Sequence, residues 1–581
     1  MRSEPFPQEE MLRQRLPVIS IVLVVVSIFL LGRLMSFQLQ LDPTVLNYLE
    51  SVRNSNYSRT LRLAAARGNI FDRDMQALAV NTLEYRVGIS PNLVSNPREL
   101  ATQLAGIMGL DELETFQKLS TNSSWELLAP RVSAEVGHQL TQLNSVAIQM
   151  DPIPRRSYPQ GTLASHVVGF VGGDLIGYYG VEGFYQSDLA GRERDREVSN
   201  IPFVVPEDQR EDRGADLILT IDREMQFLAE AELQQAVAET GSTEGTIIIM
   251  NPRNGEILAM ANYPSYDPNA YYDVNDPSLL ANPAIGEQYE PGSVMKVLTI
   301  ASALELGIVG PNDTYLDQGA LEAGGIRIEN WDRQAHGVVD MTGILVQSLN
   351  VGAATVSLDM GPLAFYGKLR DFGFGRPTGV DLQGEAPGTM YVPGDEDYSD
   401  SQLLTNSFGQ GIAVTPLQML TAVSAIANDG LMMQPHVFKE LIDDDRQQTS
   451  EPSTLGRPIS EETARLVTEM MVAVVNEGLD GNASLPGYSI AGKTGTAQIP
   501  TPIGYEPNAS IVSFVGFLPA DDPQVSVLVK LNRPSGYWGS QVAAPVFQRL
   551  AERLVILLKI PPDDIRWALQ AEGGVVNEIS R

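Results

Sequence analysis

The sequence contains no cysteine and only four histidines in 581 residues. The absence of cysteine excludes structural disulfides, cysteine-based zinc sites and thiol nucleophiles. The histidines His138, His166, His336 and His436 are scattered, and none lies at a spacing typical of metal ligands. No phosphate-binding loop is present either. We therefore predict a protein that needs neither a metal nor another cofactor.

Basic residues are scarce, with 40 lysines and arginines against 72 acidic residues and a net charge of -32. This charge would repel a phosphate backbone over most of the surface, so nucleic acid is excluded as an expected partner. Hydrophobic residues make up 43% of the chain and charged residues 19%, which is typical of folded globular proteins. The length predicts two or more domains.

Long hydrophobic runs are absent except for one near the N-terminus. Residues 16–36 are almost uncharged and long enough to cross a bilayer as a helix. Arg2, Arg13 and Arg15 precede this run, which predicts a cytoplasmic N-terminus and an extracytoplasmic remainder. A cleaved signal peptide is the alternative, but Arg33–Phe37 does not contain a small-residue cleavage site. We predict a single-pass protein of the cell membrane.

The exported part separates into two regions at the charged segment 191–213. We expect strands at 217–221, 246–250, 256–261, 511–518 and 524–531, and helices at 223–239 and 543–559. Asn254-Gly255 is typical of a tight hairpin turn. Strands at both ends of the second region, with a helical middle, predict an α+β fold whose antiparallel sheet joins distant parts of the chain and is flanked by helices. The expected segments are a cytoplasmic tail (1–15), a transmembrane anchor (16–36), a non-catalytic domain (37–205), a catalytic domain (214–560) and a C-terminal tail (561–581).

Ser293 and Lys296 begin an apolar helical stretch in the sequence Pro-Gly-Ser-Val-Met-Lys. Positions i and i+3 share a helix face, so the Lys296 amine can reach the Ser293 hydroxyl. A buried lysine with a depressed pKa can accept the serine proton. Such a spacing also arises by chance at an ordinary capped helix start.

Two further polar motifs follow. Ser348-Leu349-Asn350 offers a hydroxyl and an amide, although a turn or a helix cap would use the same residues. Lys493-Thr494-Gly495-Thr496 begins where a strand is expected, and its cation and hydroxyls suit a terminal carboxylate. Gly495 would let a substrate backbone approach closely, whereas the simple alternative is a polar edge strand.

The three motifs occur in the order Ser-x-x-Lys, Ser-x-Asn, Lys-Thr-Gly, which is the set typical of penicillin-binding proteins and serine β-lactamases. The chain resembles class B penicillin-binding proteins. Arg67–Arg73 resembles their N-terminal signature, with Met75 where the family usually has glycine. Further similar segments are Arg156–Pro159, with Gly161, Ala164, His166 and Gly169 after it, then Gly180–Glu182, Ser407–Gly411 and Thr415–Gln418. Residues 37–205 would then be the pedestal, a dimerisation-type domain, and residues 214–560 the transpeptidase domain.

The resemblance implies a D,D-transpeptidase that cross-links peptidoglycan stem peptides through a Ser293 acyl-enzyme. Lys296 would deprotonate Ser293, Ser348 would relay a proton, and Asn350 would hold Lys296 and the substrate amide. Lys493, Thr494 and Thr496 would bind the terminal carboxylate, and the backbone N–H groups of Ser293 and Thr496 would form the oxyanion hole. Implied partners are the stem peptides, β-lactams as covalent inhibitors, a polytopic membrane glycosyltransferase and other cell-wall machinery.

Residues 509–519, 537–539 and 543–547 resemble division transpeptidases, which favours a septal role over an elongation-specific one. A class A β-lactamase would add a Glu-x-x-x-Asn motif, which does not occur between Asn350 and Lys493. The motifs of a glycosyltransferase domain are not recognised between 36 and 205, which argues against a bifunctional enzyme. A non-catalytic scaffold or β-lactam sensor is a further alternative, disfavoured by the intact motifs.

Overall fold

The computed structural model describes residues 7–39, 58–63, 66–191, 194–199, 213–443, 446–501, 504–536 and 538–571. These residues belong to two compact units. The first comprises 1–65 and 192–212, and the second comprises 66–191 and 213–581. Most of the expected boundary, residues 200–212, lies outside the described residues.

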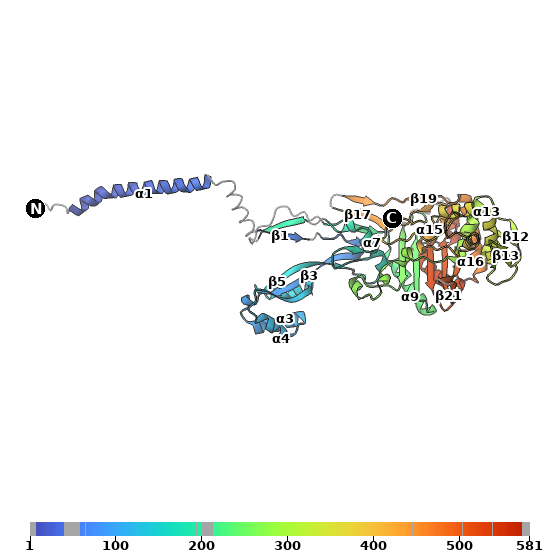
Figure 1. Cartoon of the computed structure of the whole chain (residues 1–581), viewed down its shortest axis with the longest axis horizontal. Helices are drawn as coiled ribbons and strands as arrows, with labels where there is room; N and C mark the ends of the chain where they lie inside the picture. Colours follow the sequence, from blue (N-terminus) through green and yellow to red (C-terminus); the bar gives the residue numbers. More distant parts are fainter. Residues whose placement is uncertain are drawn as a thin grey trace. The chain divides into compact units, whose positions relative to one another are not determined.

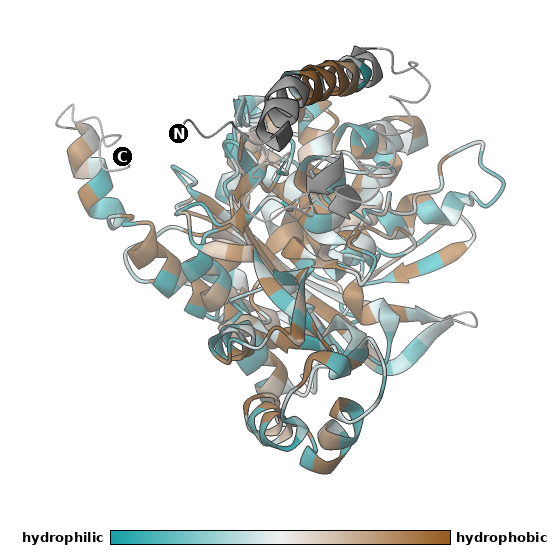
Figure 2. Cartoon of the chain, turned by 90° about the vertical axis from the view of Figure 1, so that its left-hand side faces the viewer, coloured by the Kyte–Doolittle hydropathy of each residue, from teal (hydrophilic) through white to brown (hydrophobic). Residues whose placement is uncertain are grey.

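The first unit contains the predicted membrane span. Helix α1 (Pro7–Leu39) includes a window, Pro17–Met35, with a mean hydropathy of 2.7. Figure 2 shows this part of α1 as a continuous hydrophobic band. It is the one helix in the described part of the chain that is long and apolar enough to cross a membrane. Strands β1 (Ser58–Leu63) and β8 (Arg194–Ser199) pair antiparallel in the same unit.

The N-terminal part of the second unit is a small α+β layer. Strand β3 (Ala77–Ile89) pairs antiparallel with β4 (Glu126–Ser133) and β5 (Ile148–Ser157). Helices α3 (Pro97–Met108), α4 (Glu112–Leu119) and α5 (Ala134–Gln142) pack beside these strands around Val87, Ile89, Leu104 and Leu140 (Figure 1). Each helix begins at a residue whose side chain caps a backbone N–H group, namely Asn96, Asp111 and Ser133.

A second sheet region joins this layer to the rest of the chain. Strand β9 (Asp216–Leu219) pairs in parallel with β2 (Ile70–Phe71) and antiparallel with β17 (Phe438–Ile442). The predicted strand near residue 217 therefore exists, but it extends the sheet of the N-terminal part. The expected boundary between 205 and 214 is thus crossed by a continuous sheet, and Arg67–Asp72 is built into that junction.

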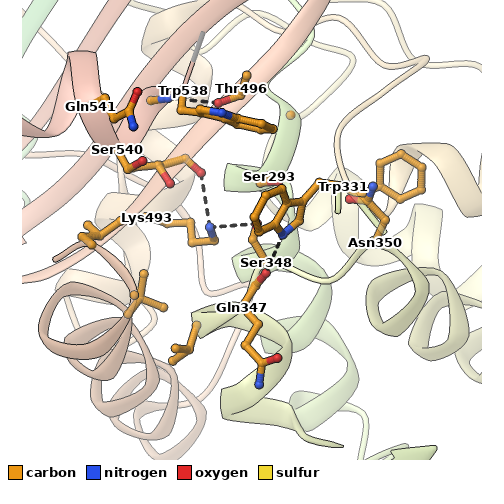
Figure 3. Close-up of a pocket in the computed structure, with 18 of the residues that line it drawn as sticks. Ser293, Trp331, Gln347, Ser348, Asn350, Lys493, Thr496, Trp538, Ser540 and Gln541 are labelled. Carbon is orange, nitrogen blue, oxygen red and sulfur yellow. Dashed lines mark hydrogen bonds between the residues drawn. The ribbon is translucent and has the colours of Figure 1, made fainter. Parts of the chain in front are cut away.

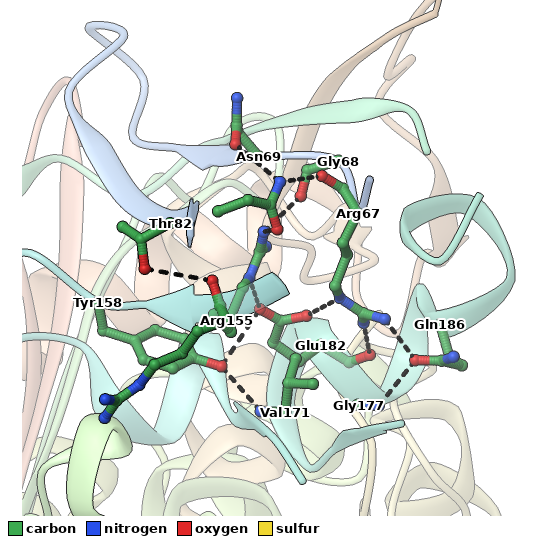
Figure 4. A network of polar contacts seen from close by, with 12 residues as sticks. Arg67, Gly68, Asn69, Thr82, Arg155, Tyr158, Val171, Gly177, Glu182 and Gln186 are labelled. Atoms are coloured by element: carbon green, nitrogen blue, oxygen red, sulfur yellow. Dashed lines mark hydrogen bonds and ion pairs between the residues drawn. The ribbon is translucent and has the colours of Figure 1, made fainter. Parts of the chain in front are cut away.

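Three motifs of the N-terminal part meet in one buried network (Figure 4). The Glu182 carboxylate is fully buried, and its two oxygens accept hydrogen bonds from Arg67 Nε and Arg156 Nε, both at 2.6 Å. Tyr158 donates its hydroxyl to Glu182 at 3.4 Å, and Arg67 Nη1 donates to Gln186 at 2.7 Å. Because a buried charge requires partners, one carboxylate holds two distant segments together.

The C-terminal part is built on a five-stranded antiparallel sheet in the order β11-β10-β22-β21-β20. The bounds of these strands are β10 Glu244–Met250, β11 Ile257–Tyr263, β20 Ala491–Thr501, β21 Gly504–Leu518 and β22 Val525–Asn532. The predicted hairpin after residue 246 is present, and Gly255 has φ +83°, which suits glycine. Strands from both ends of the region form one sheet, so the predicted α+β fold is confirmed.

Helices cover this sheet. Helix α9 (Arg223–Thr240) packs on β11 and against α17 (Gly539–Leu557), while α16 (Glu461–Gly478) packs on β20 with α15 (Pro416–Ala427) and α11 (Met295–Glu305) nearby. Helix α13 (Asn350–Asp371) packs against α11. Residues 563–571, expected as tail, form helix α18 (Asp563–Ala571). Its buried Arg566 pairs with Asp563 three residues earlier and with the distant Asp521, and no local pattern indicates the second contact.

Candidate active site

Ser293 lies in the short helix η4 (Gly292–Val294), directly before α11. Gly292 has φ +57°, and a Cβ atom there would come within 2.7 Å of the Thr496 carbonyl oxygen on β20. Gly292 N also donates to the Gly409 carbonyl at 3.1 Å. These close backbone contacts require glycine and hold the Ser293 turn against β20.

Lys296 is fully buried one turn after Ser293, on α11. Its Nζ atom donates to the Ser348 carbonyl at 2.5 Å and lies 3.2 Å from Ser348 Oγ. Ser348 has φ +56°, a left-handed conformation that is unfavourable for a residue other than glycine. Such strain persists where the surroundings demand it, and here it directs both Ser348 oxygens toward Lys296.

Lys493 is a second buried lysine beside the same hydroxyl. Its Nζ atom lies 3.1 Å from Ser348 Oγ and 3.4 Å from the Thr494 carbonyl. Burial lowers the pKa of Lys493 to about 8, and burial together with the nearby charge of Lys493 lowers the pKa of Lys296 well below its usual value. Ser348 therefore contacts two amines with lowered pKa values, and an amine that has lost its proton is free to accept one from a hydroxyl.

Strand β20 is the edge strand of its sheet and carries the Lys-Thr-Gly-Thr motif. Thr494 and Thr496 are partly exposed, whereas Gly495 is buried, and a Cβ on Gly495 would lie 2.7 Å from the Pro291 carbonyl. Thr496 Oγ1 accepts a hydrogen bond from Gly539 N at 3.1 Å. The motif thus presents two hydroxyls and a lysine from an edge strand next to the Ser293 turn.

Asn350 begins helix α13 and lines the same cavity as Ser293. Its side-chain amide donates to the Glu329 carbonyl at 3.0 Å. The expected contact between Asn350 and Lys296 is not among the hydrogen bonds of the described residues. Both Lys296 bonds go to Ser348 instead.

The predicted residues surround one cavity of about 710 Å³ (Figure 3). Ser293, Ser348, Asn350, Lys493, Thr494 and Thr496 line it, while Lys296 lies buried behind Ser348. Sequence reasoning missed several other lining residues, chiefly Trp331, His336, Gln410, Glu477, Asp480 and Trp538. His336, expected to be an ordinary structural residue, also pairs with Asp332 at 3.0 Å. The resemblance of residues 537–539 to division transpeptidases included Trp538 without assigning it to the site, and no pattern in the sequence indicates Trp331.

A serine hydroxyl, two buried lysines with lowered pKa and an edge strand are the groups that serine acyl transfer with a lysine base would need. No group of three or more potential metal ligands occurs within the described ranges. The arrangement can deprotonate a hydroxyl without a histidine. It can also place a carboxylate against Lys493.

Comparison with known proteins identifies the family. Residues 245–552 match the penicillin binding protein transpeptidase domain, and residues 62–201 match the penicillin-binding protein dimerisation domain. The chain is 35% identical to Stage V sporulation protein D of Bacillus subtilis, covering 86% of this chain and 79% of that protein. It is 30% identical to the peptidoglycan D,D-transpeptidase FtsI of Escherichia coli K12, covering 92% and 90%.

Solved structures agree. The crystal structure of penicillin binding protein 3 from Mycobacterium tuberculosis, complexed with aztreonam, matches with a TM-score of 0.66 and 29% identity over 86% of this chain and 97% of that chain. The chain therefore belongs to the class B penicillin-binding proteins and carries their transpeptidase domain. The resemblance, the fold class and the enzyme class expected from the sequence are confirmed.

Proposed function

We propose that this protein is a peptidoglycan D,D-transpeptidase that carries its acyl group on Ser293. The observation that supports this most directly is the Ser348 hydroxyl, which lies between Lys296 and Lys493 beside the Ser293 turn. Ser293 Oγ attacks the carbonyl carbon of the penultimate D-alanine, and the bond to the terminal D-alanine nitrogen breaks. The amine of a neighbouring stem peptide then attacks the ester and releases Ser293.

Each predicted residue has a role in this scheme. Lys296, neutral because of its lowered pKa, accepts the Ser293 proton, and Ser348 passes a proton to the departing amine. Lys493, Thr494 and Thr496 bind the terminal carboxylate of the stem peptide. The backbone N–H groups of Ser293 and Thr496 stabilise the oxyanion.

Asn350 and Gly495 shape the substrate channel. The Asn350 side chain, fixed on the Glu329 carbonyl, presents its oxygen as an acceptor for a substrate amide. Gly495 leaves room for the substrate backbone along the edge of β20. β-Lactams would occupy the same cavity, because their strained amide resembles the D-alanyl-D-alanine bond and their carboxylate suits Lys493.

Covalent labelling by a fluorescent penicillin tests the proposal. The full-length protein in detergent should be labelled at Ser293, and Ser293→Ala should abolish the label. Lys296→Ala should slow labelling by about 10² to 10⁴ in rate, the usual contribution of a general base. Ser187→Ala, on an exposed serine, is the control and should label normally. Unchanged labelling of Ser293→Ala would exclude this nucleophile.

A septal role is proposed for this activity. It is supported by the resemblance of residues 509–519 and 543–547 to division transpeptidases and by the similarity to proteins named FtsI. An elongation-specific transpeptidase remains the alternative within the family. A non-catalytic sensor would bind penicillin without turnover of a thioester or stem-peptide substrate, so a turnover assay separates it from an enzyme.

The non-catalytic region is proposed to dock a polytopic membrane glycosyltransferase and other cell-wall machinery. The supporting observation is that the catalytic motifs all lie beyond residue 214, whereas residues 85–150 enclose a hydrophobic core of their own. Deletion of this layer should abolish the association. It will also weaken the remaining fold, because the two parts share the sheet that contains β9.

The orientation in the membrane is a separate proposal. Arg2, Arg13 and Arg15 support a cytoplasmic N-terminus, and protease protection of an N-terminal tag in spheroplasts tests it.

A further inference from the structure

Two tryptophans meet at the cavity that contains Ser293. Trp331 and Trp538 both line this cavity, and their ring centroids lie 5.3 Å apart in a T-shaped arrangement of 71° (Figure 3). Their exposed fractions are 54% and 37%, which are high for such large aromatic side chains. We call this pair the aromatic bridge. None of the three catalytic motifs contains either residue.

Trp331 is attached to the Ser348 motif. Its indole Nε1 donates to the Gln347 carbonyl at 3.0 Å, directly before Ser348 in the chain. On the other side of Ser348, the Asn350 amide donates to the Glu329 carbonyl at 3.0 Å. The segment that carries Trp331 is therefore tied to the Gln347 carbonyl before Ser348 and to the Asn350 side chain after it.

Trp538 is attached to β20. It is the residue directly before α17, and the next residue, Gly539, donates its N–H to Thr496 Oγ1 at 3.1 Å. A Cβ atom on Gly539 would lie only 2.5 Å from the Gly495 carbonyl oxygen. Trp538 is therefore held close to the strand that carries Lys493.

The aromatic bridge thus links the Ser348 segment to the Lys493 strand through the contact between the two indole rings. Ser348 needs such support, because its left-handed backbone is unfavourable for a residue other than glycine and persists only where neighbouring contacts impose it. Its hydroxyl must also keep contact with Lys296 and Lys493, at 3.2 and 3.1 Å. A change in the distance between the two segments would break this double contact.

We propose that Trp331 and Trp538 are positioning residues for acyl transfer, which set the distance between Ser348 and β20 through their mutual contact. This inference rests on the proposed acylation of Ser293. The contacts form one chain: Trp331 is bonded to the Gln347 carbonyl, its ring contacts Trp538, and Trp538 is held at β20. All of them are needed to fix the distance between Ser348 and β20. Loss of either link releases the same constraint. The bridge therefore affects the chemical step more than the binding of substrate.

Substitutions separate the two links. Trp331→Phe keeps a ring against Trp538 but removes the donor to Gln347, whereas Trp538→Leu removes the ring contact and keeps that donor. Each should lower the first-order acylation rate constant of penicillin by roughly 2- to 10-fold, as expected from one hydrogen bond or one aromatic pair. The dissociation constant of the initial complex should stay near the wild-type value.

The double variant gives the decisive comparison. If both tryptophans act through the same chain of contacts, the acylation rate constant of Trp331→Phe/Trp538→Leu should be no lower than that of the slower single variant. Trp538→Phe should restore most of the rate, because a ring contact remains. Trp567→Phe is the matched control: Trp567 is 53% exposed and donates to Asp521 at 2.8 Å, but it does not line the cavity. This variant should acylate at the wild-type rate.

Several outcomes would overturn the positioning role. Multiplicative effects in the double variant would show two independent contacts. A change in the dissociation constant alone would show that the tryptophans only contact substrate, and unchanged kinetics in both single variants would show that they do neither. Failure of wild-type protein to label at Ser293 would reject the proposed function itself, which keeps the two tests distinct.

Discussion

The Nζ atom of Lys296 donates to the backbone carbonyl of Ser348 at 2.5 Å, although the two residues lie in separate motifs of the sequence. The same nitrogen lies 3.2 Å from the Ser348 hydroxyl, and the lysine is fully buried. Burial and the nearby charge of Lys493 lower the pKa of Lys296, so this amine loses its proton more easily than a lysine in water. The pH dependence of acylation should report this environment.

Removing the charge of Lys493 should move the pH dependence of acylation upward. The acylation rate rises with pH as Lys296 loses its proton, and the pKa of Lys296 is lowered first by burial and then by the charge of Lys493. In Lys493→Met the second effect is lost, so the rising limb should shift to higher pH. Thr494→Val is the control, because it weakens carboxylate binding without changing charge. A limb that stays in place or moves downward in Lys493→Met would contradict this account.

The buried Lys493 should also make the folded protein more stable as pH rises. Its pKa is about 8 in the fold against 10.5 in the unfolded chain, so the unfolded state binds more protons between these values. The difference of about 2.5 units corresponds to on the order of 3 kcal/mol, gained between about pH 8 and pH 10.5. Urea unfolding at several pH values should show the rise, and Lys493→Met should reduce it. An equal rise in both proteins would refute this assignment.

Replacing Met75 with glycine should stabilise the fold. It has φ +64° in a turn where Asp72 accepts hydrogen bonds from Asp74 N and Gln76 N at 2.9 and 2.7 Å. A left-handed residue other than glycine costs about 1–2 kcal/mol, partly offset by the entropy that glycine loses on folding. Met75→Gly should therefore raise Tm by about 1–4 °C, measured by calorimetry. Met75→Ala retains Cβ and should give no increase.

The three motifs were sufficient to predict which residues meet in the candidate site. Their order placed Ser293, Lys296, Ser348 and Lys493 in one enzyme family, and the structure brings these residues together. Turn chemistry also located the Asn254-Gly255 hairpin, because its signal is local. The family's usual glycine at the position of Met75 has a physical reason, since the backbone there has a positive φ.

Contacts between distant segments could not be predicted in the same way. The Trp331–Trp538 pair, the Asn350–Glu329 bond and the pairing of β9 with β2 depend on tertiary packing, which leaves no periodic pattern in the sequence. Helix α18 was missed because its docking depends on Arg566 reaching Asp521. The spacing of residues in the sequence indicates which chemical groups share a helix face or a strand. Which distant residue each group contacts depends on the complete fold.

Glu182 should be essential to the stability of the second unit. Two arginines, Arg67 and Arg156, depend on its carboxylate in a fully buried setting. Glu182→Leu leaves two uncompensated buried cations and should cost about 3–5 kcal/mol in the free energy of unfolding. Glu469→Gln, which breaks the exposed pair with Arg465, is the matched control and should change little. Urea titration of both variants measures the difference, and a small effect at Glu182 would mean that solvent reaches the network.

The septal role predicts a specific phenotype in the native host. Depletion of a division transpeptidase stops cross-linking at the septum while lateral growth continues, so cells should form filaments or unseparated chains. A fluorescent fusion should gather at midcell. The chain carrying Ser293→Ala should localise there without restoring division, because α1 and residues 66–191 are unchanged. Rounded, swelling cells with dispersed lateral fluorescence would instead assign the enzyme to elongation. That result would leave the acyl-enzyme on Ser293 untouched, since both roles require the same contacts of Ser348 with Lys296 and Lys493.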